Sequence, residues 1–242
     1  MKILAIETST DACSVALTTH GETAVEHSVA PQQHAKLLLP MIDRLMAKAE
    51  LTPSALDAVA YGTGPGSFTG VRIAAAATQG IAFAANVPTV GVSSLHALAQ
   101  SVWRLSGATH VVAAIDARMA EVYWGAYAIN DMNVMTNVLQ DQICQPEQLP
   151  LNALEGLSDK HDSWVCAGTG ADAYQQSLKS RLLTDGVIAF SPNQTPHALD
   201  ILSIAKPLVE SGTVATAADA IPVYIRNKVA LTEEERAKGL RL

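Results

Sequence analysis

The pattern that most constrains this chain is an order of segments that occurs twice. A short apolar segment, KILAIE, opens the sequence and ends at Glu7, and a second apolar run at residues 111–115 ends at Asp116. Each has the continuous apolar character of a strand buried on both faces, and alternating strand-like segments follow each one. Three strands, then alternating helices and strands, given twice, predict an α/β protein with the duplicated ribonuclease-H-like or actin-like ATPase (ASKHA) fold in two lobes.

The interruption between the two copies predicts a domain boundary. Ser106 and Gly107 break the pattern, so we place the boundary near residues 104–108. The chain then divides into an N-terminal lobe of residues 1–105 and a smaller C-terminal lobe of residues 106–242. The charged end that follows Arg226, TEEERAKGLRL, is expected to be a short helix or a frayed tail.

Charge and cysteine content exclude several classes of function. The net charge of −7 argues against unaided binding of nucleic acid, which depends on Lys and Arg, so a role on RNA would need a basic partner. The three cysteines have no paired spacing and indicate neither a disulfide framework nor a zinc site. Nothing targets the chain for export, and a cytoplasmic protein is expected.

An uncharged stretch at residues 73–95 is long enough to cross a bilayer. It is rich in alanine, contains polar residues and is interrupted by Pro88. We therefore interpret it as a buried helix, a turn and a strand, and expect no membrane span.

The motif IETST at residues 6–10 is a candidate phosphate-binding turn. In two-lobed ATPases of this architecture, an acidic residue at the end of the first strand positions a metal-bound water, and small hydroxylated residues face the phosphates. Glu7, Thr8 and Ser9, with Asp116 at the matching position of the second copy, are the candidate residues. The alternative is a tight turn in which Thr8 and Ser9 bond to local backbone groups.

A glycine-rich loop, GTGPGSFTG at residues 62–70, lies between a predicted strand and a predicted helix. It lacks the Gly-Lys-Ser/Thr ending of a Walker loop. Glycines before a helix can present N–H groups to an anion. Equally, Gly64 and Gly66 can take positive φ in a turn, with Ser67 or Thr69 capping the helix. Both interpretations remain open from the sequence.

The histidines offer no HxxxH or HExxH spacing, and no GxSxG elbow is present. A catalytic metal therefore has no evident ligand set, and we expect no metal site and no catalytic residue in this chain.

The helix predicted at residues 69–86 carries one charge and is apolar all round, which is unusual for a helix with a face in water. One face, with Ile73, Ala77, Ile81 and Ala84, is expected to pack on the sheet of its own lobe. The opposite faces of this helix and of the one before it predict a protein interface, unless the second lobe or the tail covers them. The expected interface residues are Leu37, Met41, Arg44, Leu45, Lys48, Arg72, Ala75, Ala76, Gln79 and Phe83.

Six segments together resemble the bacterial TsaB family, also called YeaZ, over nearly the whole chain. The combination of GPGSFTG with DAR…EVY is the most specific part of this resemblance. The segments are IETST, QHAKLLLPMI (33–42), GTGPGSFTGVRI (62–73), GVSSLHALA (91–99), DARMAEVYWGAY (116–127) and PVYIRN (222–227).

This resemblance implies a subunit that supports TsaD, the catalytic subunit that transfers threonylcarbamoyl to N6 of the adenosine beside the tRNA anticodon. It also implies the ATPase TsaE as a partner and contact with tRNA only through the complex. The uncovered apolar surface of the two helices predicts a homodimer when the chain is alone. No tightly bound cofactor is expected, with ATP or ADP at the interface of the complex.

The resemblance also concerns catalysis. The HxxxH pair of the catalytic subunit corresponds here to Ser94 and Leu98, neither of which is a histidine. The resemblance therefore implies an accessory role, with IETST as a relic. Two alternatives remain: an independent ATP-dependent kinase or carbamoyl-type transferase that uses Glu7, Thr8, Ser9 and Asp116, and a metallopeptidase-like protein.

Overall fold

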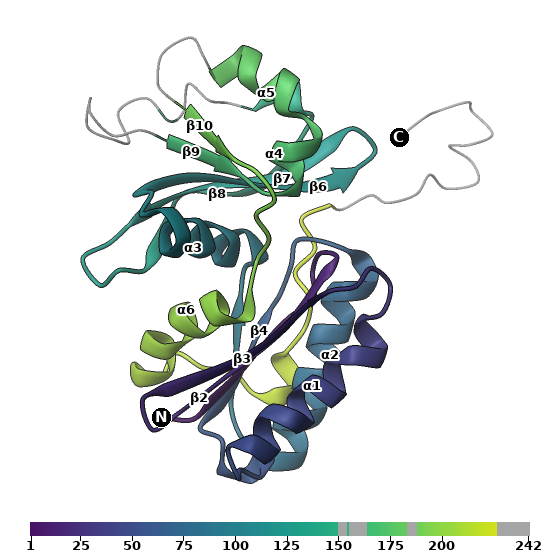
Figure 1. The fold of residues 1–242 in the computed structure, drawn as a ribbon, viewed down its shortest axis with the longest axis vertical. Helices are drawn as coiled ribbons and strands as arrows, with labels where there is room; N and C mark the ends of the chain where they lie inside the picture. Colours follow the sequence, from purple (N-terminus) through teal and green to yellow (C-terminus); the bar gives the residue numbers. More distant parts are fainter. Residues whose placement is uncertain (150–153, 155–163, 183–187, 227–242) are drawn as a thin grey trace, which may run out of the picture.

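Two five-stranded sheets, one in each lobe, form the centre of the protein (Figure 1). The computed structural model describes residues 1–149, 154, 164–182 and 188–226. The first sheet contains β1 (Ile3–Glu7), β2 (Ala12–Thr19), β3 (Glu22–Val29), β4 (Ala58–Gly62) and β5 (Thr89–Val92). The second contains β6 (His110–Arg118), β7 (Glu121–Ile129), β8 (Met135–Cys144), β9 (Trp164–Ala167) and β10 (Ile188–Ser191).

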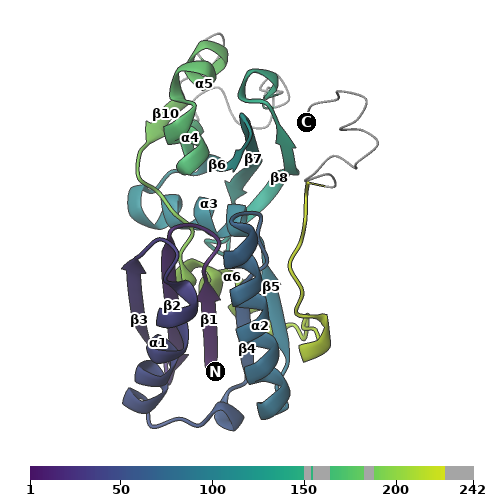
Figure 2. The same cartoon turned by 90° about the vertical axis from the view of Figure 1, so that its right-hand side faces the viewer.

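The two sheets share one topology. The strand order is β3-β2-β1-β4-β5 in the first sheet, visible from side to side in Figure 2, and β8-β7-β6-β9-β10 in the second. In each, the first strand is central, antiparallel to the second strand and parallel to the fourth. The predicted duplication, with a meander opening each half, is confirmed.

The helices cover both faces of each sheet. In the first lobe, α1 (His34–Lys48) and α2 (Phe68–Ala85) lie on one face and α6 (Ala198–Glu210) on the other (Figure 1). The second lobe has α3 (Ser94–Ser106), α4 (Thr169–Ala173) and α5 (Gln175–Leu182). Short 3₁₀ turns among the described residues include Pro53–Ala55, Pro146–Gln148 and Ala217–Asp219.

Strand β1 is continuously apolar because both of its faces are buried. Because side chains alternate across a strand, Leu4 and Ile6 pack in the cluster that includes α1 and α2, whereas Ile3 and Ala5 pack against α6. All four side chains are fully buried.

Helices α3 and α6 each cross to the sheet of the other half of the chain. Leu98 of α3 packs in the core of the second sheet, and Ile201 of α6 packs in the core of the first. Division of the chain at the predicted boundary would separate the two sheets. It would also leave α3 in the segment of the first sheet and α6 in the segment of the second, although each packs on the other sheet. The division into domains at residues 104–108 stays a prediction.

The two crossing helices are joined by a buried ion pair. Arg104 of α3 donates through Nε and Nη2 to the two carboxylate oxygens of Asp200 of α6, both at 2.8 Å. The Asp200 side chain is fully buried, and burial raises its pKa, although the hydrogen bonds from Arg104 act in the opposite direction. This pair therefore connects the helix that covers the second sheet, α3, to the helix that covers the first, α6.

No helix among the described residues is long and apolar enough to span a membrane. The tail predicted after Arg226 lies outside the described residues.

We expect Arg104→Ala to lower the free energy of unfolding by about 3–5 kcal/mol, because it removes the charged partner of the buried Asp200 carboxylate. Arg44→Ala is the matched control, since Arg44 makes a similar pair with Glu26 on the surface. The control should cost much less, because water and salt screen a surface pair. Urea unfolding of the two variants measures both values, and equal losses would contradict the role given to the buried pair.

Candidate functional site

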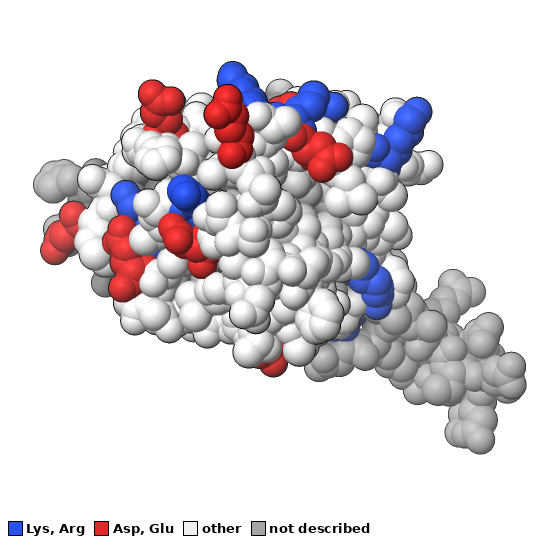
Figure 3. All heavy atoms as spheres, turned by 90° about the horizontal axis from the view of Figure 1, so that it is seen from below, with Lys and Arg blue, Asp and Glu red and all other residues white. Residues whose placement is uncertain are grey.

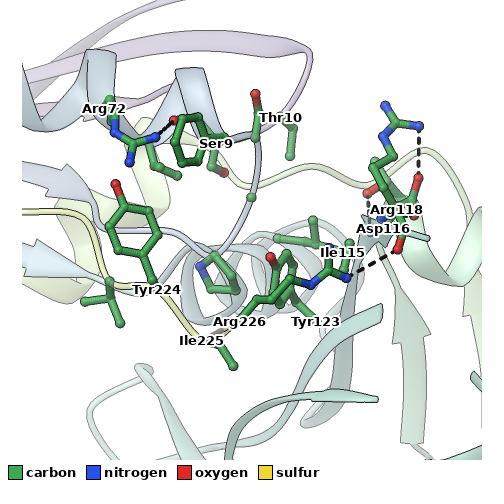
Figure 4. Close-up of a pocket in the computed structure, with 18 of the residues that line it drawn as sticks. Ser9, Thr10, Arg72, Ile115, Asp116, Arg118, Tyr123, Tyr224, Ile225 and Arg226 are labelled. Carbon is green, nitrogen blue, oxygen red and sulfur yellow. Dashed lines mark hydrogen bonds and ion pairs between the residues drawn. The ribbon is translucent and has the colours of Figure 1, made fainter. Parts of the chain in front are cut away.

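A cavity of about 780 Å³ lies between the lobes (Figure 4). Its walls come from the β1–β2 turn, the start of α2, the β6–β7 hairpin, α4 and the extended segment at residues 223–226. The lining residues are Ser9, Thr10, Asp11, Pro65, Gly66, Ser67, Phe68, Val71, Arg72, Ile115, Asp116, Ala117, Arg118, Tyr123, Thr169, Val223, Tyr224, Ile225 and Arg226.

The glycine-rich loop packs directly on the turn that follows β1. A Cβ atom at Gly62 would overlap the Glu7 carboxylate, and one at Gly66 or Gly70 would overlap the backbone oxygen of Ser9 or Thr8. The Ser67 N–H donates to the Ser9 carbonyl at 2.7 Å. Each of these three glycines is therefore required by a close approach, of Gly62 to the Glu7 side chain and of Gly66 and Gly70 to the backbone of the turn.

The loop's predicted geometry is partly confirmed. Gly64 has a φ of +94°, and Ser67 caps α2 by accepting from the Gly70 N–H at 3.4 Å. The prediction of positive φ at Gly66 is wrong: only the space occupied by Ser9 requires glycine there. Thr69 lies inside the helix and is not the cap.

Glu7 and Thr8 are sealed beneath the cavity. Glu7 accepts from the Ser9 N–H at 2.5 Å and from the Ser94 hydroxyl at 2.9 Å, and Thr8 Oγ1 donates to the Gly70 carbonyl at 2.8 Å. Burial raises the pKa of Glu7 above its ordinary value, although these hydrogen bonds lower it. Neither residue lines the cavity, whereas Ser9 does.

Asp116, the matching residue of the second copy, lines the cavity but is engaged by its neighbours. Its carboxylate lies 3.1 Å from Arg118 Nη1 and accepts from the Arg118 N–H at 2.8 Å and the Tyr174 hydroxyl at 3.3 Å. The structure thus brings only Ser9 and Asp116, of the four candidate phosphate residues, to the cavity wall.

Ser94 and Leu98, at the positions of the HxxxH pair, both have structural contacts. Ser94 is buried and bonded to Glu7, and Leu98 is fully buried in the core of the second lobe. Within the described residues, no group of three or more His, Cys, Asp or Glu side chains is placed to hold a metal ion.

The predicted outer faces of α1 and α2 require correction. Met41, Leu45 and Ala75 were expected outside but are only 3%, 4% and 4% exposed, because they pack in the core of their own lobe. Conversely, Ala84 was expected inside and is exposed. Arg44, Lys48, Arg72, Ala76 and Phe83 are exposed, and Leu37 and Gln79 are half-buried.

The face of the first lobe seen from below carries no single-sign patch. Acidic and basic side chains lie interspersed around a broad area without charged residues (Figure 3). This face therefore offers no concentration of positive charge for RNA.

Several residues of the cavity had no predicted role in the sequence. The segment at residues 223–226 crosses from the first lobe, where the Val223 N–H donates to the Thr63 carbonyl, to the second lobe, where Arg226 pairs with Glu121. PVYIRN contributed to the family resemblance but predicted no site. With one aromatic and one basic residue, Tyr224 and Arg226, this segment carries no local signal of a site.

Comparisons with known proteins agree with this geometry. A family model described as "TsaD: tRNA N6-adenosine threonylcarbamoyltransferase" matches residues 23–233. The chain is 39% identical to the "tRNA threonylcarbamoyladenosine biosynthesis protein TsaB" of Escherichia coli (strain K12), covering 95% of this chain and 96% of that protein. The same description applies to a relative in Haemophilus influenzae, 39% identical, with 95% of each chain covered.

Among solved structures, "YeaZ from Pseudomonas aeruginosa" is 41% identical with a TM-score of 0.81, covering 92% of this chain and 99% of that one. Fold and family model define a two-lobed, actin-like protein of the wider TsaD group. Within that group, the chain belongs to the TsaB (YeaZ) family.

Two glycines of one helix test the packing of the loop on the turn. We expect Gly70→Ala to lower the free energy of unfolding by about 1–3 kcal/mol or more, because its Cβ would meet the Thr8 carbonyl. Gly80→Ala is the matched control, since a Cβ there meets nothing within 4 Å. It should stabilise the helix by about 0.5–1 kcal/mol. Thermal melts of both variants measure the difference, and a neutral Gly70→Ala would refute the close contact.

The raised pKa of Glu7 predicts a pH dependence of stability. The folded state holds this proton to a higher pH than the unfolded chain, whose ordinary value is 4.5. Its contribution is therefore most favourable below pH 4.5 and falls as the pH rises through the folded-state pKa. Glutamine at this position stays neutral while keeping hydrogen bonds to Ser9 and Ser94.

We accordingly expect the stability of Glu7→Gln, relative to the wild type, to increase as the pH rises above 4.5. Urea unfolding at a series of pH values measures this difference, in which the other titrating groups cancel. If the free energies of unfolding of the two proteins changed with pH in parallel, Glu7 would have the same pKa in the folded and unfolded states, and the prediction would be wrong.

Proposed function

We propose that this chain takes part in the synthesis of N6-threonylcarbamoyladenosine in tRNA, in the cytoplasm, as a non-catalytic subunit that binds the catalytic subunit TsaD. The observation that carries the proposal is the family membership: relatives 39% identical over nearly their whole length are named as proteins of this biosynthesis. The similarity extends over both lobes, so the proposal applies to the whole chain.

The accessory role is supported by what the residues at the catalytic positions do here. Ser94 bonds to a buried carboxylate and Leu98 fills an apolar core, so both positions serve packing. Glu7 is covered by Gly62 and Ser94 and cannot reach a ligand in the cavity. The proposed subunit contributes binding surface and leaves the transfer reaction to its partner.

The proposed partner surface is the outer stripe of α2, which comprises Arg72, Ala76, Gly80 and Phe83. Phe83 is 83% exposed, and the described part of the second lobe leaves the stripe uncovered. Small side chains between an arginine and an aromatic residue allow a partner helix to approach closely, and these residue types are enriched at interfaces. From α1, the exposed Arg44 and Lys48 and the half-buried Leu37 adjoin it.

The proposal includes the other members of the complex. When the partner is absent, we propose that two copies of this chain pair through the same stripe, because an uncovered apolar surface favours self-association. TsaE joins the assembled complex, ATP or ADP binds at the interface of the complex, and tRNA is held through the complex.

Two adjacent alanines in α2 provide a matched test. We expect Ala76→Glu to change the stability of the free chain by no more than about 0.5 kcal/mol, because the carboxylate faces water. It should abolish the homodimer and co-purification with TsaD, since the interface would bury an unpaired charge. Ala75→Glu, one residue earlier, should unfold the lobe, because Ala75 is buried in its core.

Sedimentation of the free variants, thermal melts, and pull-downs with TsaD measure these effects. Normal TsaD binding by Ala76→Glu would place the interface elsewhere. Turnover of ATP by the isolated chain at an ordinary enzymatic rate would contradict the accessory role.

A further inference from the structure

The turn between β6 and β7 is built from residues that do not favour its backbone conformation. Arg118, Met119 and Ala120 all have positive φ, at +61°, +58° and +58°. Residues other than glycine, asparagine and aspartate adopt this left-handed conformation rarely, and then one at a time. A two-residue hairpin loop with positive φ at both positions favours Asn-Gly, whereas this chain has Met-Ala there. The turn is therefore strained.

The strained turn is held from two sides, since strained backbone persists only where its surroundings hold it. Within the hairpin, the Arg118 N–H donates to the Asp116 carboxylate at 2.8 Å. From outside the hairpin, Arg226 contacts both ends of the turn. Its Nη2 donates to the Arg118 carbonyl at 3.5 Å and pairs with the Glu121 carboxylate, and its Nη1 donates to Met119 Sδ at 3.4 Å. The Arg226 side chain is 13% exposed, so water screens these contacts little.

The same arginine ends a strap, residues 221–226, that runs along the cavity and is bonded mainly to the first lobe. The Tyr61 hydroxyl donates to the Ile221 carbonyl at 3.1 Å. Further along, the Val223 N–H donates to the Thr63 carbonyl at 2.9 Å. Within the described residues, every hydrogen bond and ion pair from the strap to the second lobe is made by its last side chain, which Figure 4 shows pointing toward the hairpin.

One side chain therefore holds both the strap and the turn. The strap leaves the second lobe only if Arg226 leaves the turn, and the turn then loses contacts that keep it left-handed. Conversely, a relaxed turn no longer presents the Arg118 carbonyl and the Glu121 carboxylate in the arrangement that Arg226 binds. The strain in the turn favours opening of the strap, and the contacts of Arg226 oppose it. The two changes are thus coupled.

We propose that Arg226 is the latch of a strap with two states. In the closed state, which the structure describes, the strap forms part of the cavity wall and the turn is strained. In the open state, Arg226 has left Glu121, the turn has relaxed and residues 223–226 no longer line the cavity. Because the strap and Arg118 of the turn both line the cavity, the latch controls access to it. The device lies within the chain and goes beyond the proposed function.

Amide hydrogen exchange of the isolated full chain measures opening at both places. In Arg226→Gln, we expect the amides of residues 117–122 and 221–225 to exchange about tenfold faster or more, because charge-assisted hydrogen bonds are lost. Glu121→Gln removes the ion pair and leaves the bond to the Arg118 carbonyl, so it should speed exchange less, in the same two segments. Arg44→Gln, which breaks a surface ion pair of the first lobe, should change neither segment.

A glycine in the turn tests whether the latch holds the strain. Ala120→Gly removes a Cβ atom from a position with a φ of +58°. It should raise the melting temperature of the otherwise wild-type chain by about 1–3 °C. The same gain should appear in the Arg44→Gln background. In the Arg226→Gln background the gain should disappear, because the relaxed turn needs no left-handed residue there and glycine then only makes the unfolded chain more flexible.

The proposal is overturned if Arg226→Gln speeds exchange in only one of the two segments or in neither, since the strap and the turn would then be held separately. It is also overturned if Ala120→Gly gives the same gain in all three backgrounds, because the hairpin alone would then hold the strain. The milder Glu121→Gln provides the same comparisons if Arg226→Gln does not fold. None of these measurements involves TsaD, so this proposal and the proposed function fail in different assays.

Discussion

The contact of Gly62, Gly66 and Gly70 with the turn at residues 7–9 sets the arrangement of the first lobe. It places the start of α2 directly over the end of β1, and the same contact encloses the Glu7 carboxylate. Because Gly62 and Ser94 occupy the space around that carboxylate, the residue that the sequence suggested as a phosphate-site acid serves here as a buried acceptor. The site that remains between the lobes is formed by what the contact leaves uncovered: Ser9 and the N-terminus of α2.

The sequence predicted the fold well because its strand signals are strong and local. KILAIE, buried on both faces, and the matching run before Asp116 established the two sheets and their common topology. The rotation of the helices was harder to predict. Helix α2 is rich in alanine all round, so its periodicity hardly distinguishes Ala75, which is buried, from Ala76, which is exposed. Methionine and leucine at positions 41 and 45 were misplaced for a related reason: the buried stripe of α1 is wider than one line of residues.

Other features depend on contacts between segments far apart in the chain, for which the sequence has no local signal. Nothing near Arg104 indicates that it meets Asp200, and nothing in PVYIRN indicates that it crosses the cavity. The same is true of charge at the site. Three arginines line the cavity, but only the folded arrangement shows that two of them are paired with carboxylates and that, within the described part of the chain, Arg72 is not.

The exchange of α3 and α6 between the sheets has a consequence for folding of the chain during its translation on the ribosome. The first sheet is complete once β5 has been made, yet the face formed by Ile3 and Ala5 has no cover until α6 emerges, late in translation. During that interval an apolar surface is exposed on a nascent chain, where it favours aggregation or contact with chaperones. The first lobe therefore cannot finish folding until the strands of the second lobe have been translated, whereas α3 is already present when the second lobe is made.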